Sequence, residues 1–244
     1  MLTHPSGKTL KFNKKKHKYS VGNKEIISVT TLVDKFFPKF DRQGISKRYA
    51  EKHDLNQNDV LKEWRDKGIR TKDIGNRCHL YASNLVEYLY NSESKKIIKP
   101  YDVRYAIIAD KIFELLEKYS VLYTECKIFS LKFDIAGTFD LLLTDDNILY
   151  LYDWKTVEKI DVENPWQTCN YPITHLDASK FNKFALQLNL YKFILESENY
   201  FTNTEYKMAI LHVTESDCIE IPVPDMKREI KAIIIEREIL NGKK

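Results

Sequence analysis

Hydrophobic residues recur along the chain with two spacings, one typical of strands and one typical of helices. Short apolar runs bounded by glycine, proline, asparagine or aspartate predict β-strands. Two pairs of these runs are joined by turn sequences, Gly22-Asn23 near the start and Asp145-Asp146-Asn147 in the middle of the chain. The segments expected to form strands are 8–13, 17–21, 25–28, 122–130, 133–143, 148–155, 205–214 and 218–223.

Segments with an apolar residue at every third or fourth position predict amphipathic helices. Ser28 is a suitable N-cap for the first of them, and Pro38 follows its end. Residues 156–180 follow neither spacing and are expected to be irregular. The expected helices are 28–37, 45–53, 58–67, 72–89, 103–118, 181–195 and 225–240.

This order of elements predicts an α/β fold with a central mixed sheet flanked by helices, preceded by a small N-terminal β-ribbon and a helical region. The 244 residues contain no linker rich in glycine, serine or proline, so residues 1–244 are expected to form a single domain. No apolar stretch approaches the roughly 18 residues of a membrane helix, and the first residues lack the apolar region of a signal peptide. We therefore expect an intracellular protein.

Positive charge is concentrated at the front of the chain. Residues 1–75 contain 18 Lys and Arg against 9 Asp and Glu, whereas residues 76–244 contain 21 against 26. The densest run includes Lys14, Lys15, Lys16 and Lys18, and Arg48 belongs to its continuation. Such a patch attracts a phosphate backbone without reading its sequence. The alternative is a solvated turn without a partner.

Asp140, Asp153 and Lys155 carry the chemistry on which the functional prediction depends. They belong to two adjoining predicted strands, and alternation places Asp153 and Lys155 on the same face while Trp154 points to the other. Two carboxylates suit Mg²⁺ or Mn²⁺, and an ammonium group beside them can position water and offset developing charge on phosphorus. The alternative is a surface ion pair that contributes roughly 0 to 1 kcal/mol.

Five short motifs in a fixed order resemble the RecB-like exonuclease branch of the PD-(D/E)XK nuclease superfamily. The resemblance covers about residues 20–195, and a Ser-Val-Thr-Thr segment at residue 28 fits the same pattern. The five motifs are Gly75-Asn76-Arg77-Cys78-His79, Glu125 on a strand, Gly137-Thr138-Phe139-Asp140, Asp153-Trp154-Lys155-Thr156, and Gln187-Leu188-Asn189-Leu190-Tyr191.

The resemblance implies a PD-(D/E)XK core at residues 71–200, with 1–70 as a basic N-terminal subregion and 201–244 as C-terminal strands and helix. It implies that His79, Asp140, Asp153 and the carbonyl of Trp154 bind Mg²⁺ or Mn²⁺. Glu125 stays open as a further ligand, an outer acid or a lysine partner. Catalytic roles are implied for Asp140, Asp153, Lys155, Gln187 and Tyr191.

The implied activity is metal-dependent DNA hydrolysis, most simply an exonuclease that acts on single-stranded ends and leaves 5′-phosphates in replication, recombination or repair. Two alternatives stay open: a catalytically idle protein that binds DNA ends, and a structure-specific or sequence-specific endonuclease. Trp166 and Tyr171 in the irregular segment are candidates for stacking on bases. The four cysteines are scattered without a C-x-x-C pair, so no iron–sulfur cluster is expected. The oligomeric state is left open.

Overall fold

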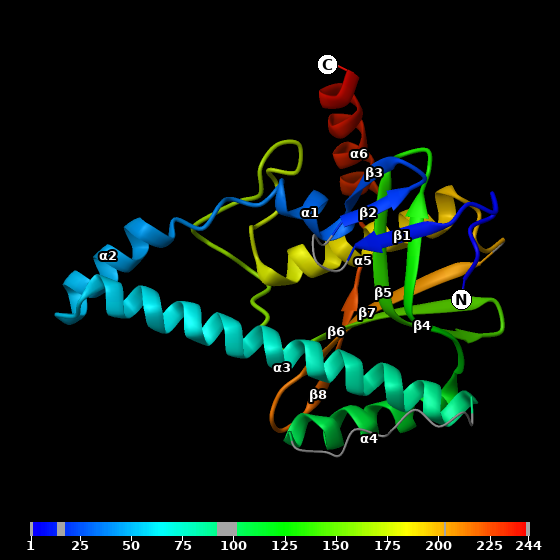
Figure 1. Cartoon of the computed structure of the whole chain (residues 1–244), viewed down its shortest axis with the longest axis horizontal. Helices are drawn as coiled ribbons and strands as arrows, with labels where there is room; N and C mark the ends of the chain where they lie inside the picture. Colours follow the sequence, from blue (N-terminus) through cyan, green and yellow to red (C-terminus); the bar gives the residue numbers. More distant parts are fainter. Residues whose placement is uncertain (1, 14–17, 92–101, 203, 243–244) are drawn as a thin grey trace.

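The computed structural model describes residues 2–13, 18–91, 102–202 and 204–242, and its centre is an eight-stranded mixed β-sheet flanked by helices (Figure 1). This confirms the predicted α/β class. Seven strands follow the order β1-β2-β3-β5-β6-β7-β8, and β4 pairs with β5 outside that path. The strands are β1 Leu10–Asn13, β2 Lys18–Val21, β3 Lys24–Ser28, β4 Ser120–Ser130, β5 Ile135–Asp145, β6 Ile148–Lys155, β7 Glu205–Val213 and β8 Cys218–Val223.

Strand β5 changes its neighbour along one edge, and this opens a fork in the sheet. Its far end pairs antiparallel with β6 from Leu141 to Asp145, whereas its beginning pairs in parallel with β3 at Ile135 and Ala136. Strand β6 leaves β5 after Tyr152 and continues only beside β7. Residues 137–140 of β5 therefore border the fork, where side chains can approach from both faces of the sheet.

Helices cover both faces. Helices α1, α5 and α6 pack on one face with Phe139, Leu142 and Leu151 in their shared core. Helices α3 and α4 pack on the other face against Leu143 and Trp154. The helices are α1 Val29–Asp34, α2 Arg42–His53, α3 Gln57–Asn91, α4 Val103–Lys118, α5 Lys180–Ser197 and α6 Lys227–Gly242. Within the described ranges, none of them is both long and apolar enough to cross a bilayer.

Helix α3 corrects the prediction of two separate helices at 58–67 and 72–89. It runs without interruption for 35 residues, and Gly68 lies in its interior with open space where a Cβ would be. A glycine in a helix costs only about 1 kcal/mol, which packing against α2 and α4 readily outweighs. The long helix starts beside the projecting α2 and runs past the sheet to its far side, next to α4 (Figure 1).

The segment between β6 and α5 is irregular, as expected, but it is anchored. Its backbone joins the end of the first helical segment through Asn170, whose N–H donates to the carbonyl of Phe36 at 2.8 Å. A single isolated bridge pairs Thr168 with Asp177. At its start, the buried His212 of β7 bonds through Nε2 to the carbonyl of Val157 at 2.7 Å. Hydrogen bonds therefore hold the segment near its start, at Val157, and in its middle, at Asn170.

Candidate metal and catalytic site

Asp140 and Asp153 lie on the two sides of the fork. Regular pairing of β5 with β6 ends at the pair Leu141 and Tyr152. Each aspartate is the next residue of its strand beyond that pair. Oδ2 of Asp140 then accepts a 2.7 Å hydrogen bond from the backbone N–H of Trp154. This bond crosses the fork and fixes the separation of the two strand ends. Asp140 and Asp153 are only 7% and 2% exposed, although carboxylates are seldom buried without partners.

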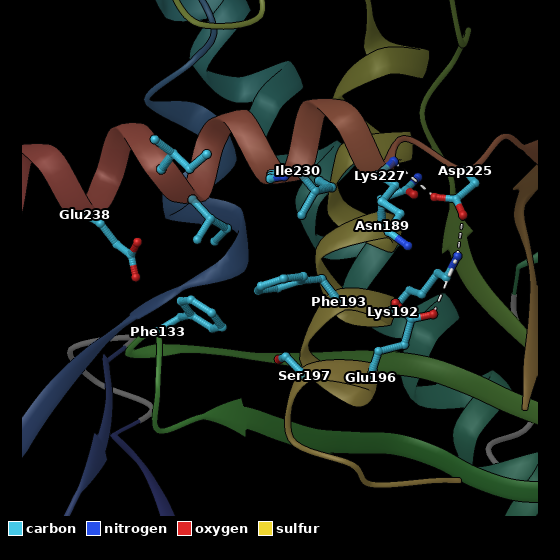
Figure 2. A pocket seen from close by; sticks show the side chains of 13 residues that line it. Phe133, Asn189, Lys192, Phe193, Glu196, Ser197, Asp225, Lys227, Ile230 and Glu238 are labelled. Atoms are coloured by element: carbon cyan, nitrogen blue, oxygen red, sulfur yellow. Dashed lines mark hydrogen bonds and ion pairs between the residues drawn. The ribbon is translucent and has the colours of Figure 1, made fainter. Parts of the chain in front are cut away.

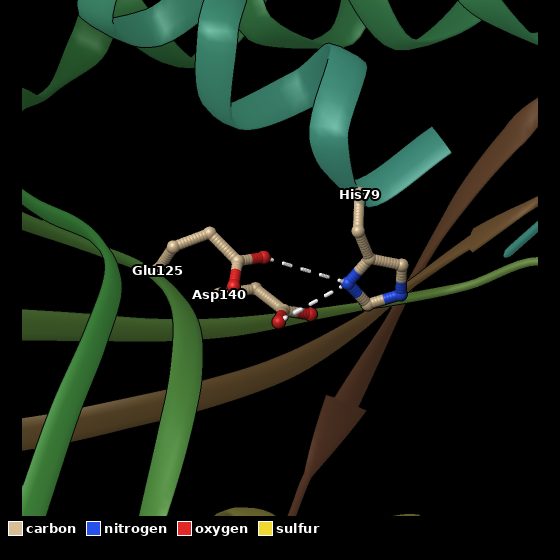
Figure 3. A group of neighbouring side chains, drawn as sticks. All are labelled: His79, Glu125 and Asp140. Atoms are coloured by element: carbon tan, nitrogen blue, oxygen red, sulfur yellow. Dashed lines mark ion pairs between the residues drawn. The ribbon is translucent and has the colours of Figure 1, made fainter. Parts of the chain in front are cut away.

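His79, Glu125 and Asp140 form one group that could hold a metal ion (Figure 3). His79 reaches the group from α3, Glu125 from β4 and Asp140 from β5. Nδ1 of His79 lies 3.2 Å from Oδ1 of Asp140 and 3.8 Å from Oε1 of Glu125. The three candidate ligand atoms lie within 4.8 Å of one another, which is close enough for shared coordination.

Glu125 adopts an unusual backbone conformation within its strand. Its φ is +45°, a region that side chains other than glycine rarely adopt. Such a residue costs of order 1–3 kcal/mol and persists where the surrounding structure holds it. Here both neighbours, Thr124 and Cys126, keep their pairing with β5. The strained residue therefore coincides with the point where the Glu125 carboxylate joins the group.

A second set of side chains holds Asp153 from the opposite face of the sheet. The ammonium of Lys155 forms an ion pair with Oδ2 of Asp153. Nε2 of Gln187, on α5, donates to Oδ1 of Asp153 and to the hydroxyl of Tyr191, each at 3.0 Å. Nζ of Lys155 also lies 4.7 Å from the ring centroid of Phe184. Lysine, aspartate and glutamine thus form one buried network.

Burial and neighbouring charges shift the pKa values of the site residues. Burial alone would lower the pKa of His79, but the neighbouring Asp140 and Glu125 outweigh it and raise the pKa to about 10. Burial opposes ionisation of Asp140, yet His79, Lys155 and the Trp154 N–H together hold its pKa below the usual value. Burial and the charge of Asp140 raise the pKa of Asp153 to about 6 despite Lys155. Without a metal, His79 is therefore protonated at neutral pH.

A cavity of about 670 Å³ opens in front of this group. One wall is a face of α3 on which polar side chains recur at helical spacing, and the other is formed by β4, β5 and the end of β6. The wall from residue 71 to residue 87 extends for about 24 Å at the helical rise of about 1.5 Å per residue. The lining residues from α3 are Thr71, Lys72, Gly75, Asn76, His79, Leu80, Ser83, Asn84 and Glu87.

Two glycines permit close approaches around the site. A Cβ on Gly75 would lie 3.2 Å from the hydroxyl of Thr156, so glycine lets α3 approach the end of β6. A Cβ on Gly137 would lie 2.4 Å from Cε1 of Tyr191. That distance is impossible without movement, so glycine at position 137 allows α5 to press its tyrosine against the edge of the fork.

The structure brings together most of the residues that the sequence nominates for metal binding and catalysis. Asp153 lies beside the metal-capable group but outside it, because its carboxylate is bound by Lys155 and Gln187. Glu125, left open from the sequence, lies inside the group. Trp154 lines the cavity, and the role predicted for its carbonyl stays a prediction.

The residues nominated for DNA binding are dispersed. Lys14, Lys15 and Lys16 lie outside the described residues. Lys18 pairs with Glu25 on the ribbon, and Arg48 is exposed on α2. Trp166 and Tyr171 are 89% and 71% exposed, and Lys18, Arg48, Trp166 and Tyr171 lie outside the cavity lining. Their binding roles stay predictions.

Sequence reasoning missed three features of the site. Phe184 lies under Lys155, and its position three residues before Gln187 on the same helix is the only signal for it. The polar face of α3 could have been found from its helical spacing. The hydroxyl of Tyr19 lies 3.0 Å from Oγ1 of Thr138, a contact between residues 119 positions apart that no local pattern reveals.

All four cysteines are free thiols, and none belongs to the metal-capable group found among the described residues. No protein family model and no curated protein matches the chain. Among solved structures, the chain is similar to the crystal structure of SSO0001, with a TM-score of 0.37 and 14% identity over 91% of this chain and 78% of that one. A likeness at this level carries no argument about fold family or function.

Proposed function

We propose that the chain is a divalent-metal-dependent DNA exonuclease of the PD-(D/E)XK type. The observation that carries the proposal is the meeting of an imidazole and two carboxylates beside a buried aspartate–lysine pair, on the wall of an open cavity. The ordered motifs support the same family. Single-stranded ends are the proposed substrate and 5′-phosphates the proposed products.

The donor set fits Mg²⁺ or Mn²⁺. Both ions accept carboxylate oxygens and retain water, and the imidazole of His79 shifts the preference towards Mn²⁺. With His79 protonated, the five ionisable groups of the site have a net formal charge of −1. Replacing this proton by a divalent ion would bring that charge to zero. A bound ion would act as a Lewis acid that lowers the pKa of water and offsets phosphate charge.

The protein groups divide the remaining work. Lys155 is suited to orient the attacking water and to stabilise negative charge that builds on the phosphate. Asp153 holds the Lys155 ammonium, and Gln187 holds Asp153 through its 3.0 Å bond. Because Phe184 shields one side of the ammonium, the lysine side chain has few alternative positions. These residues arrange the reacting groups before substrate arrives.

The α3 wall supports a polynucleotide substrate without sequence preference. Amide side chains such as Asn76 and Asn84 can donate to phosphate oxygens, which orients a strand but does not identify its bases. The hydroxyls of Thr71 and Ser83 donate to carbonyls within α3. Lys72 adds positive charge at the outer end of this wall. A polar wall of this length that runs past the metal-capable group fits a strand whose backbone lies along α3.

The test is cleavage of single-stranded and duplex oligonucleotides labelled at either end, with Mn²⁺, with Mg²⁺ or with a chelator. Metal-dependent release of short products from an end is the expected result. Lys155→Ala should remove this activity, whereas Lys159→Ala, an exposed lysine four residues along the chain, should preserve it.

Two other results would contradict the proposal. Tight binding of DNA ends without cleavage under every metal condition would indicate an idle binding protein. One discrete internal cut at a fixed sequence or junction would indicate an endonuclease. The label position separates the two exonuclease polarities in the same experiment.

A further inference from the structure

Helix α6 presents an exposed apolar stripe on the side of the molecule opposite to α3. Ile235 and Ile239, four residues apart on one face of the helix, are each 46% exposed. The stripe borders a groove of about 440 Å³ between α5 and α6, which Phe133 limits at one end (Figure 2). Phe133 and Phe193 lie 5.0 Å apart between ring centroids, and Ile230 and Ile234 complete the apolar part of a lining that also contains charged side chains such as Lys192. An exposed apolar surface of this kind is typical of a site that binds another protein.

The charged residues of α6 are separated by sign along the helix. Its first half carries Lys227, Arg228 and Lys231, and its second half carries Glu236 and Glu238. None of these five forms an ion pair with another residue in the part of the chain that the structure describes. The two remaining charged residues of α6 contact other elements. Glu229 bonds His175 at 2.9 Å. Arg237 donates to the carbonyls of Phe133 and Asp134.

Four of the groove-lining residues of α6 fall on one stripe. Lys227, Lys231, Ile235 and Glu238 follow one another at spacings of four, four and three residues, so they share a helical face. Lys231 and Glu238 are about 10 Å apart along the axis and cannot pair within one helix. An antiparallel copy of the same stripe, however, would set Lys231 of each helix opposite Glu238 of the other. The stripe is therefore complementary to itself.

We propose that this face of α6, together with the groove beside it, is the interface of a homodimer with two-fold symmetry. The two α6 helices lie antiparallel about an axis near Ile235, and Lys231 of each copy faces Glu238 of the other. Ile239 of each copy enters the groove of its partner. Such an isologous contact uses the same patch twice, which is what a self-complementary stripe provides. A single helix and one groove form a small interface, so a micromolar dimer is expected.

The test is sedimentation equilibrium of the full chain from low to high micromolar concentration. The wild type should show a monomer–dimer equilibrium. Lys231→Glu and Glu238→Lys should each weaken it by about tenfold or more, because each places like charges across the axis. The double variant that carries both reversals should restore the dimer. Ile235→Asp should abolish it.

Lys47→Glu is the matched control, since it makes the same charge reversal at an exposed position on α2 and should leave the equilibrium unchanged. Circular dichroism confirms that each variant folds. A chain that stays monomeric at all concentrations overturns the proposal. So does a dimer that ignores both charge reversals, or a double variant that stays monomeric. Because α6 lies outside the cavity, the interface and the nuclease proposal can fail independently.

Discussion

The two halves of the candidate site differ in how far they are already assembled. On the α3 side, His79 and Glu125 have side chains that are 29% and 40% exposed and line the cavity. On the α5 side, Asp153 and Lys155 have side chains that are 3% and 14% exposed and are bonded to each other. Asp140 stands between the halves. The exposed half can exchange a proton for a metal ion, whereas the buried half is held by its own ion pair and by Gln187.

This difference assigns different sensitivities to the two halves. A change on the exposed side alters what the site can bind, while a change on the buried side alters how precisely the reacting groups are placed. Four substitutions separate these effects. They change the aspartate that connects the halves, the buried network, the packing behind that network and the exposed histidine.

Asp140→Asn should have the largest effect, because this residue belongs to both halves. Asparagine keeps an oxygen that can accept the N–H of Trp154 but loses the charge that faces His79. We expect the metal-dependent cleavage rate to fall by about a thousandfold, at the upper end for the loss of one electrostatic group. Asp145→Asn, at the exposed end of the same strand, should retain activity. Equal rates for the two variants would refute the assignment.

Gln187→Met should have the next largest effect, by loosening the buried half alone. Methionine has a similar length but cannot donate to Asp153, so the carboxylate that holds Lys155 loses the hydrogen bond that fixes its own orientation. We expect a loss of roughly 10- to 100-fold in kcat with little change in KM. Tyr191→Phe removes only the hydroxyl that accepts from Gln187, so its effect should be several-fold smaller. A larger effect from Tyr191→Phe would reverse this order.

Much of this architecture follows from local sequence, and the part that does not is non-local. The predicted helix at 103–118 and strand at 218–223 agree with Val103–Lys118 and Cys218–Val223, because Asp102 caps the helix and apolar runs define both elements. The fork depends on the parallel pairing of β3 with β5, which joins residues more than 100 positions apart. No local pattern specifies such a pairing.

The site shows the same division. The motifs nominated Asp140, Asp153 and Lys155, whose placement follows from strand alternation and one hairpin. The sequence could not decide the role of Glu125, because its entry into the metal-capable group depends on a positive φ that a glutamate does not favour. It also could not show that Asp153 would be engaged by Gln187. The predictions of a single domain and of the PD-(D/E)XK family stay predictions.

Gly137→Ala tests the packing that supports the buried half. The new methyl group would lie 2.4 Å from Cε1 of Tyr191, so the ring must move. We expect the free energy of unfolding to fall by about 1 to 3 kcal/mol, as for an overpacked core, when measured by urea denaturation. Adding Tyr191→Leu should recover part of this loss. Gly68→Ala is the control, since its Cβ meets open space within α3 and should stabilise by about 0.5 to 1 kcal/mol.

His79→Gln should have the smallest effect on folding stability, and that effect should depend on pH. Because Asp140 and Glu125 outweigh burial and raise the pKa of His79 to about 10, its protonation stabilises the metal-free fold fully below its unfolded pKa of about 6.5. That stabilisation is lost as the pH rises towards 10. Wild-type melting temperature, measured without metal, should therefore fall between pH 7 and pH 10 more than that of His79→Gln. His53→Gln, on the exposed end of α2, should follow the wild type.

If Mn²⁺ replaces the His79 proton, calorimetry in buffers of different ionisation enthalpy should record about one proton released per ion. The glutamine variant should release none, and an equal release from both proteins would show that His79 does not exchange its proton for the metal.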